Sequence, residues 1–238
     1  MIDFHSHILP GIDDGSQSVE QSIAMLQEEA KQGVTLVVAT PHFYPEDESV
    51  DAFLTRRDQA EALLRREMEK HENLPQLVVG TEVYYFTGIS DSDILQKLTI
   101  GNSRYVLIEP PLAPWPDRIY RELEGILLQQ GLMPVVAHID RYIRPFHSRK
   151  ILQQLARLPI MVQASGEFFL NKKTRNMALR MVKAFRIQIL GSDAHNMAER
   201  APNLGPAISL IKEKLGEEAL EYIRECETLC RQEMKRER

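Results

Sequence analysis

Residues 2–10 read IDFHSHILP, and they place two histidines at the end of a short apolar run. The run Ile2–His5 has the length and the apolar character of a buried strand. Within a strand, residues i and i+2 point to the same side, so the side chains of His5 and His7 can reach one metal ion. The opening stretch therefore predicts a strand whose carboxyl end carries a pair of metal ligands.

Further apolar runs follow, and amphipathic stretches separate them. The strand-like runs are Thr35–Thr40, Gln76–Glu82, Tyr105–Glu109, Met133–His138, Ile160–Gln163 and Ile187–Asp193. Several are continuous Val, Ile and Leu segments, which is typical of parallel strands covered on both faces. Helical periodicity is expected over 19–30, 53–68, 119–130, 148–158, 172–185 and 203–234, the last broken near Gly216.

This alternation of strand and helix favours one α/β domain that spans residues 1–238 as a closed or nearly closed β/α barrel. The motifs occupy residues 2 to about 200, and a C-terminal helical segment is expected over 203–234. No linker rich in Pro, Gly or Ser divides the chain. An open doubly wound sheet is the alternative architecture.

Composition narrows the class of protein. The formal net charge of −5 argues against a nucleic-acid binder, which needs a basic face. No window approaches the roughly 18 apolar residues of a membrane helix, and no apolar leader opens the chain. Cys226 and Cys230 lie one helical turn apart and do not suggest a disulfide framework. We therefore expect a cytoplasmic protein without membrane insertion.

Histidines and carboxylates recur at the ends of the predicted strands or just beyond them. The candidate metal ligands are His5, His7, Asp14, His42, Glu82, Glu109, His138, Asp193 and His195. Taken singly, each such residue is more often structural, and an Asp-Asp-Gly sequence is more often a turn. In a parallel barrel, however, the carboxyl ends of the strands meet on one face. Several buried charges in one place are costly unless they are paired or hold metals, so the coincidence favours a metal site.

Nine candidate ligands exceed what one zinc ion takes and suit two to three divalent ions with bridging carboxylates. Imidazole and carboxylate without thiolate fit Mn²⁺, Fe²⁺ or Zn²⁺. Three dications would outweigh the four carboxylates, and the surplus positive charge would attract a phosphate. Arg141 and Arg200 follow candidate ligands closely and could bind phosphate oxygens in a bidentate fork.

Other features receive weaker interpretations. Cys230 and Arg236 have the Cys-x₅-Arg spacing of thiol-dependent phosphatases, but the intervening residues form a charged helical run without glycine, so we regard the spacing as chance. His71 and His147 lie in predicted helical context and are expected to be structural. Aromatic residues near the ligand-bearing loops could form walls for a phenyl ring, although such residues are more often core. They are Phe43, Tyr44, Tyr84, Tyr85, Trp115 and Tyr142. The Pro-rich segment 110–116 is expected to be an ordered loop near the site mouth.

The motifs resemble the polymerase-and-histidinol-phosphatase (PHP) superfamily over nearly the whole chain. In order, they are Ile2–Pro10, Asp13-Asp14-Gly15, Ala39-Thr40-Pro41-His42, Gly80-Thr81-Glu82, Leu107-Ile108-Glu109, Ala137-His138-Ile139-Asp140-Arg141 and Ser192-Asp193-Ala194-His195-Asn196. Within the superfamily they are most similar to the PHP-type tyrosine phosphatases of bacterial capsule and exopolysaccharide operons. One departure is Asp140, where we would expect Glu; it affects no ligand.

The resemblance implies a distorted (β/α)₇ barrel of the TIM-like type with a trinuclear, usually manganese-loaded site. It implies that the nine candidates are ligands, and that Arg141 and Arg200 bind phosphate; with Asp14, these arginines are our candidate catalytic residues. The implied substrate is the phosphotyrosine-bearing C-terminal tail of a bacterial tyrosine kinase, and we hypothesise in-line attack by a metal-bound hydroxide. The alternatives are a small-molecule phosphatase such as histidinol phosphatase, a nuclease, and a metal-containing module that only binds phosphotyrosine.

Overall fold

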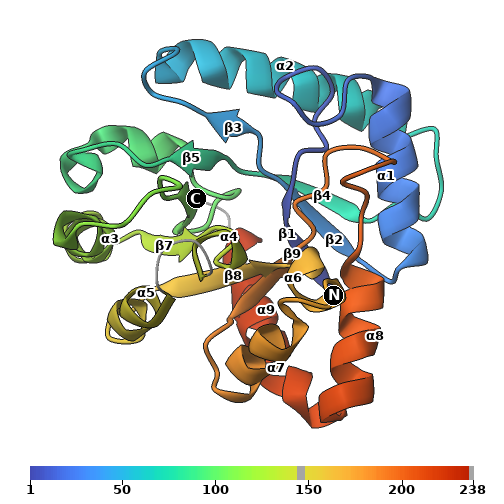
Figure 1. The fold of residues 1–238 in the computed structure, drawn as a ribbon. Coiled ribbons are helices and arrows are strands. Elements are labelled where there is room, and N and C mark those ends of the chain that lie inside the picture. The colour runs from blue at the N-terminus through green and yellow to red at the C-terminus, as the bar shows by residue number, and fades with distance from the viewer. Residues whose placement is uncertain (144–147, 236–238) are drawn as a thin grey trace.

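The computed structural model describes residues 1–143 and 148–235, with strands in the centre and helices around them (Figure 1). All strand pairings are parallel. The strands are β1 (Ile2–Ser6), β2 (Leu36–Ala39), β3 (His42–Phe43), β4 (Gln76–Val79), β5 (Glu82–Tyr84), β6 (Tyr105–Glu109), β7 (Met133–Val136), β8 (Met161–Ser165) and β9 (Ile189–Gly191).

The strands form two parallel sheets that follow one another around the molecule. One sheet has the order β1-β2-β4 and the other β3-β5-β6-β7-β8-β9. β3 continues β2, and β5 continues β4, so the two sheets join. The first and last strands lie side by side in Figure 1, and the N–H groups of Asp193 and His7 donate to His5 O and Ala194 O, each at 2.8 Å. The curled parallel sheet confirms the predicted TIM-like barrel.

The barrel is distorted where two of its strands are interrupted. The run Thr35–Thr40 is one strand as predicted, with β2 ending at Ala39, but a further short strand, β3, begins after a gap of two residues. The run Gln76–Glu82 was expected to be one strand, but the structure ends β4 at Val79 and begins β5 after a gap of two residues. Pro41 has no N–H to donate, so the ladder cannot continue through it. The neighbouring break falls at the same level, where the N–H of Glu82 donates to Pro41 O at 3.0 Å.

Helices connect the strands and cover their outer faces (Figure 1). They are α1 (Val19–Lys31), α2 (Val50–Met68), α3 (Asp117–Gln130), α4 (Asp140–Ile143), α5 (Ser148–Leu155), α6 (Gly166–Leu170), α7 (Arg175–Lys183), α8 (Leu204–Leu215) and α9 (Glu221–Met234). Ser18 and Ser49 cap α1 and α2 by accepting backbone N–H bonds. The expected break at Gly216 separates α8 from the short 3₁₀ turn Glu217–Leu220 and α9. The remaining 3₁₀ turns are Ile89–Asp91 and Asp93–Lys97.

The amino-terminal end of the strands is closed by an apolar cluster. Residues at the strand starts, such as Ile2, Leu36 and Tyr105, pack together with Cys230 and Met234 of α9. The larger hydrophobic cluster lies between the strands and the surrounding helices. Within the described ranges, no helix is both long and apolar enough to cross a membrane. Because an apolar cluster fills the amino-terminal end of the strands, polar side chains are expected at the carboxyl-terminal end.

Candidate metal centre

The structure gathers all nine candidate ligands at the carboxyl ends of the strands. His5 lies one residue before the end of β1, and His7 follows that strand directly. His42 opens β3 and Glu82 opens β5, the two short strands that follow an interruption. Glu109 ends β6, whereas His138 and Asp193 lie two residues past β7 and β9. Parallel strands thus bring residues far apart in sequence to one rim.

The first group joins the histidine pair to the end of the last strand. The Nε2 atoms of His5 and His7 are 3.1 Å apart, and each lies 3.5 Å from Asp193 Oδ1. Both imidazoles are buried, and these three residues offer ligand atoms to one common point. Two ring nitrogens at this separation repel each other unless a proton or a cation lies between them.

A second group surrounds the carboxylate of Glu82. Its Oε2 atom lies 3.1 Å from His42 Nδ1, 3.2 Å from His5 Nε2 and 3.3 Å from His7 Nε2. Its Oε1 atom lies 2.8 Å from His138 Nε2, which is also 3.3 Å from Glu109 Oε1. Glu82 therefore has the position of a bridging carboxylate between the first group and a neighbouring one.

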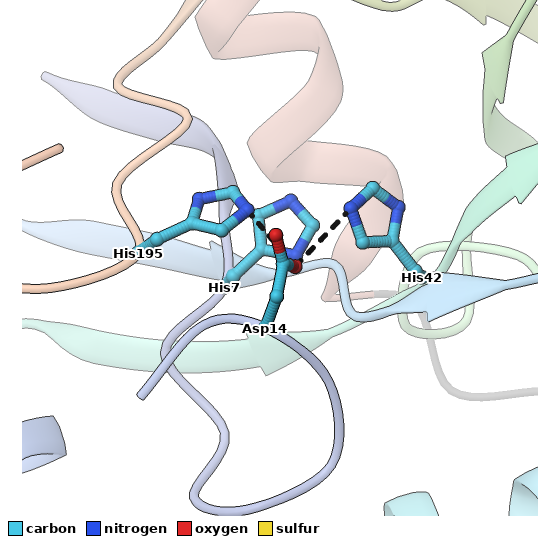
Figure 2. A group of neighbouring side chains, drawn as sticks. All are labelled: His7, Asp14, His42 and His195. Carbon is cyan, nitrogen blue, oxygen red and sulfur yellow. Dashed lines mark ion pairs between the residues drawn. The ribbon is translucent and has the colours of Figure 1, made fainter. Parts of the chain in front are cut away.

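The third group, drawn in Figure 2, contains the most exposed candidate ligand, Asp14. Asp14, from the loop after β1, points between two imidazoles: its Oδ1 atom is 3.3 Å from His195 Nε2 and 3.5 Å from His42 Nε2. His7 completes the group. The Asp14 side chain is 63% exposed, whereas His195 is buried, so the cluster opens to solvent on the side of Asp14.

The donor set fits divalent ions because its lone pairs face one another. Among the described residues, four buried side-chain atoms of this cluster have no hydrogen-bond partner: His42 Nδ1, Glu82 Oε2, His138 Nδ1 and His195 Nε2. Outer partners also select the tautomer of the rings. His7 Nδ1 lies 2.8 Å from Asp13 Oδ2, and His195 Nδ1 lies 3.0 Å from Asp193 O. A proton on each Nδ1 leaves the Nε2 lone pairs aimed into the cluster.

Asp13 and Gln163 are functional residues that sequence reasoning missed. Asp13 accepts from the N–H of Gly15 at 2.9 Å and of His42 at 3.0 Å while it holds the ring of His7. Gln163 Oε1 accepts from the N–H of His138 and lies 3.3 Å from His5 Nδ1. In the sequence, Asp13 cannot be told from an ordinary turn residue. Gln163, by contrast, is a single amide at the end of the apolar run Ile160–Gln163, and that position could have marked it as part of the site.

Similarity to known proteins places the chain in a family. The family model for capsular polysaccharide synthesis, CpsB/CapC, matches residues 1–228. The chain belongs to this family. The tyrosine-protein phosphatase CpsB of Streptococcus pneumoniae is 32% identical over 238 residues, 91% of each chain, and that of Streptococcus agalactiae is 30% identical over 239 residues, 92% of each chain. The resemblance predicted from the motifs is thereby confirmed.

Solved structures give the same result. A chain from the crystal structures of YwqE from Bacillus subtilis and CpsB from Streptococcus pneumoniae, described as metal-dependent tyrosine phosphatases, matches with a TM-score of 0.84 and 26% identity, over 97% of this chain and 94% of that one. Histidinol phosphate phosphatase from Lactococcus lactis matches with a TM-score of 0.56 and 16% identity, over 89% of this chain and 92% of that one. The second likeness is one of fold alone.

In this CpsB/CapC family member, charge is shared between the carboxylates and the rings. Burial alone would raise the pKa of Glu82 and Asp193, but the nearby histidines hold both pKa values well below the usual range. Burial alone would lower the pKa of His138, but hydrogen bonds to Glu109 and Glu82 raise it to about 9. Burial and the charge of His7 lower the pKa of His195 to about 3. Protons and metal ions therefore compete for the same lone pairs.

The backbone is strained at two candidate ligands. His138 has φ 27° and Asp193 has φ 54°, in the left-handed region that non-glycine residues rarely adopt. Each follows the end of a strand and turns its side chain into the cluster. Such strain costs about 1–3 kcal/mol per residue and persists where the surrounding structure enforces it, as at functional sites.

Both predicted phosphate-binding arginines lie beside the cluster. Arg141 and Arg200 contact Asp193 Oδ2 at 2.5 and 2.8 Å, whereas the histidine pair lies near the other oxygen, Oδ1. They line a pocket of about 200 Å³ together with Ser165 and Asn203. Both side chains are more than a third exposed, so a ligand can reach the guanidinium groups.

The remaining candidates separate into core and surface. Cys230 is buried at the amino-terminal end of the strands, far from the cluster in the barrel, and Arg236 lies outside the described residues. His71, just beyond the end of α2, pairs with Glu67 of that helix at 3.5 Å, as expected of a structural residue, and His147 also lies outside the described residues. Trp115 is buried against Tyr142, with ring centroids 4.9 Å apart, so the Pro-rich segment packs on the helix that follows His138.

Proposed function

We propose that the chain is a manganese-dependent protein-tyrosine phosphatase that acts in capsule or exopolysaccharide synthesis. The observation that carries the proposal is the convergence of imidazole and carboxylate lone pairs in one cluster with two arginines at its edge. Relatives named tyrosine-protein phosphatase share about a third of their residues with this chain over nearly its whole length. Five histidines and four carboxylates, all nine of the predicted ligands, would hold the ions.

Each group of residues has its own task in this proposal. Arg141 and Arg200 would bind the phosphoryl oxygens, and Asp193 holds both guanidinium groups in place. Asp13 and Gln163 would orient the rings of His7 and His5. Bound divalent ions would neutralise phosphoryl charge and lower the pKa of coordinated water. The phenol of tyrosine has a pKa near 10, so its departure needs less protonation than that of an alkoxide, and we assign no general acid.

The proposal also names one metal and one substrate. Mixed imidazole and carboxylate donors without thiolate suit Mn²⁺, with Fe²⁺ and Zn²⁺ as rivals. We propose the phosphotyrosine-bearing tail of a bacterial tyrosine kinase as the substrate, in the cytoplasm. Both cysteines are free, which agrees with a reducing compartment.

A phosphate-release assay tests the proposal. The purified chain is stripped of metal, reloaded with Mn²⁺, Fe²⁺ or Zn²⁺, and offered a peptide with several phosphotyrosines or histidinol phosphate. We expect release from the peptide that requires metal and stops with EDTA. Turnover that survives the chelator would overturn the metal-dependent mechanism, and a preference for histidinol phosphate would reassign the substrate. Binding of the peptide without turnover under every metal would indicate a binding module instead.

A further inference from the structure

Two tyrosines form an exposed aromatic surface on one side of the candidate metal centre. Tyr44 stacks on His42, with ring centroids 5.3 Å apart and an interplanar angle of 30°. Tyr84 lies beyond it, with centroids 5.5 Å apart and an angle of 47°. We call Tyr44 and Tyr84 the tyrosine pair. Tyr44 is 37% exposed and Tyr84 is half-buried, so their rings are accessible from solvent.

The other aromatic residues near the ligand-bearing loops cannot contact a ligand in this way. Phe43 and Tyr142 are 1% exposed, Trp115 4% and Tyr85 7%. The ring of Phe43 packs on Phe53, and the hydroxyl of Tyr85 donates to Glu122. These side chains form core, whereas the tyrosine pair is left facing the site.

The tyrosine pair and the arginines contact different candidate ligands of the same cluster. Tyr44 follows β3 by one residue and stacks on His42, while Arg141 and Arg200 bind Asp193 at the end of β9. Asp14, the most exposed candidate ligand, reaches His42 and the region of Arg200 from the intervening loop. The ester substituent of a phosphoryl group held by the arginines and the metal centre would therefore be within reach of the tyrosine pair.

We propose that the tyrosine pair binds the phenyl ring of the substrate and so favours aryl over alkyl phosphates. This inference rests on the proposed phosphatase function and adds a specificity surface to it. Stacked aromatic rings contribute beyond the area that they bury, and a flat ring fits a tyrosine face better than an alkyl chain does. The tyrosine pair acts on binding, so its loss should raise KM far more than it lowers kcat.

The test compares Tyr44→Leu, Tyr84→Leu and Tyr44→Phe with the manganese-loaded wild type. We expect each leucine variant to raise KM for a phosphotyrosine peptide about two- to tenfold while the inhibition constant of inorganic phosphate stays the same. Tyr44→Phe keeps the ring and should behave like the wild type. Phe185→Leu removes an aromatic side chain that is 62% exposed next to Tyr222, before β9, and serves as the matched control.

Metal content is measured for every variant, because Tyr44 stacks on a candidate ligand. If Tyr44→Leu loses metal, Tyr84→Leu decides the question, since the ring of Tyr84 contacts Tyr44 at a tilt and does not stack on a candidate ligand. An unchanged KM in Tyr84→Leu, or equal weakening of phosphate and peptide, would overturn the inference while the wild type stays active. Absence of turnover in the wild type would instead contradict the proposed function, and this inference would fail with it.

Discussion

The two ends of the barrel differ in what their side chains do for stability. At the amino-terminal end, strand starts and α9 form an apolar cluster with Cys230 and Met234. At the carboxyl-terminal end, histidines and carboxylates are buried together, several of their polar atoms lack hydrogen bonds, and two residues have strained backbone. Buried polar groups without partners are costly. The amino-terminal end therefore stabilises the barrel. The carboxyl-terminal end lowers its stability, and bound metal ions would offset this cost by contacting the buried polar atoms.

The largest effect is expected from Glu82→Gln at the carboxyl-terminal end. Glu82 lies among His5, His7, His42 and His138, so the loss of its charge should release metal and reduce phosphate release by more than about a hundredfold. Metal analysis and the phosphopeptide assay measure both. The exposed Glu72→Gln is the control, and full activity in Glu82→Gln would contradict the central position of this carboxylate.

The next prediction concerns Asp13, which holds candidate ligands in place by hydrogen bonds. Asp13→Ala removes the partner of His7 Nδ1 and of the His42 N–H, and it should weaken metal binding about 10- to 100-fold. Asp13→Asn, which keeps an acceptor oxygen, should have a smaller effect. A Mn²⁺ titration of stripped protein measures the affinities. Equal affinity in wild type and Asp13→Ala would show that the ring of His7 needs no outer partner.

A third prediction concerns a buried carboxyl group whose effect on stability depends on pH. Glu29 is buried on α1 beside Asp3, and burial and the charge of Asp3 raise its pKa from the usual 4.5 to about 11. The unfolded chain ionises this group above about 4.5 while the folded protein keeps it neutral, so its contribution to stability falls as pH rises from there toward 11. Glu29→Gln should raise the free energy of unfolding by about 2 kcal/mol at pH 8 and by almost nothing at pH 4.

Urea unfolding at the two pH values measures this difference. Glu28→Gln, on the same helix, is the control, because a hydrogen bond to Gln32 lowers the pKa of Glu28 and its replacement should give no gain. A loss of stability in Glu29→Gln at pH 8 would mean that the carboxyl group is ionised and paired in the folded protein.

The smallest effect on activity is expected at the amino-terminal end. Cys230→Ser places a hydroxyl in the apolar cluster and should lower the free energy of unfolding by about 1–3 kcal/mol, with metal content and turnover per folded molecule unchanged. The half-buried Cys226→Ser should cost less. Thermal unfolding and the phosphopeptide assay measure the two properties. Loss of turnover in a folded Cys230→Ser protein would revive a thiol-dependent mechanism.

Much of the fold could be predicted because strand positions are strongly patterned. The run Tyr105–Glu109 is a strand with the predicted bounds, and the helix break at Gly216 was also foreseen. The short helices α4 and α6 were missed, since four and five residues are too few to show a helical period. The run Thr35–Thr40 stops before Pro41, which has no N–H to donate, and the structure agrees, but the break within Gln76–Glu82 was not foreseen.

The site was harder to predict beyond the ligands themselves. His5, His7 and Glu82 stand out because polar groups at the ends of apolar runs are rare and their spacing implies a common rim. Asp13 and Gln163 belong to the site because they contact the rings of His7 and His5 in the folded chain, and a single sequence does not reveal such contacts. Likewise, the accessibility that separates Tyr44 from the buried Phe43 appears only in the folded chain.

The most direct test of the account is the position of metal ions in a crystal of the manganese-loaded protein, located by anomalous scattering at the metal edge. We predict two to three ions within coordinating distance of the nine candidate ligands from His5 to His195. An active crystal form whose ions lie elsewhere, or an active protein that holds none, would contradict it.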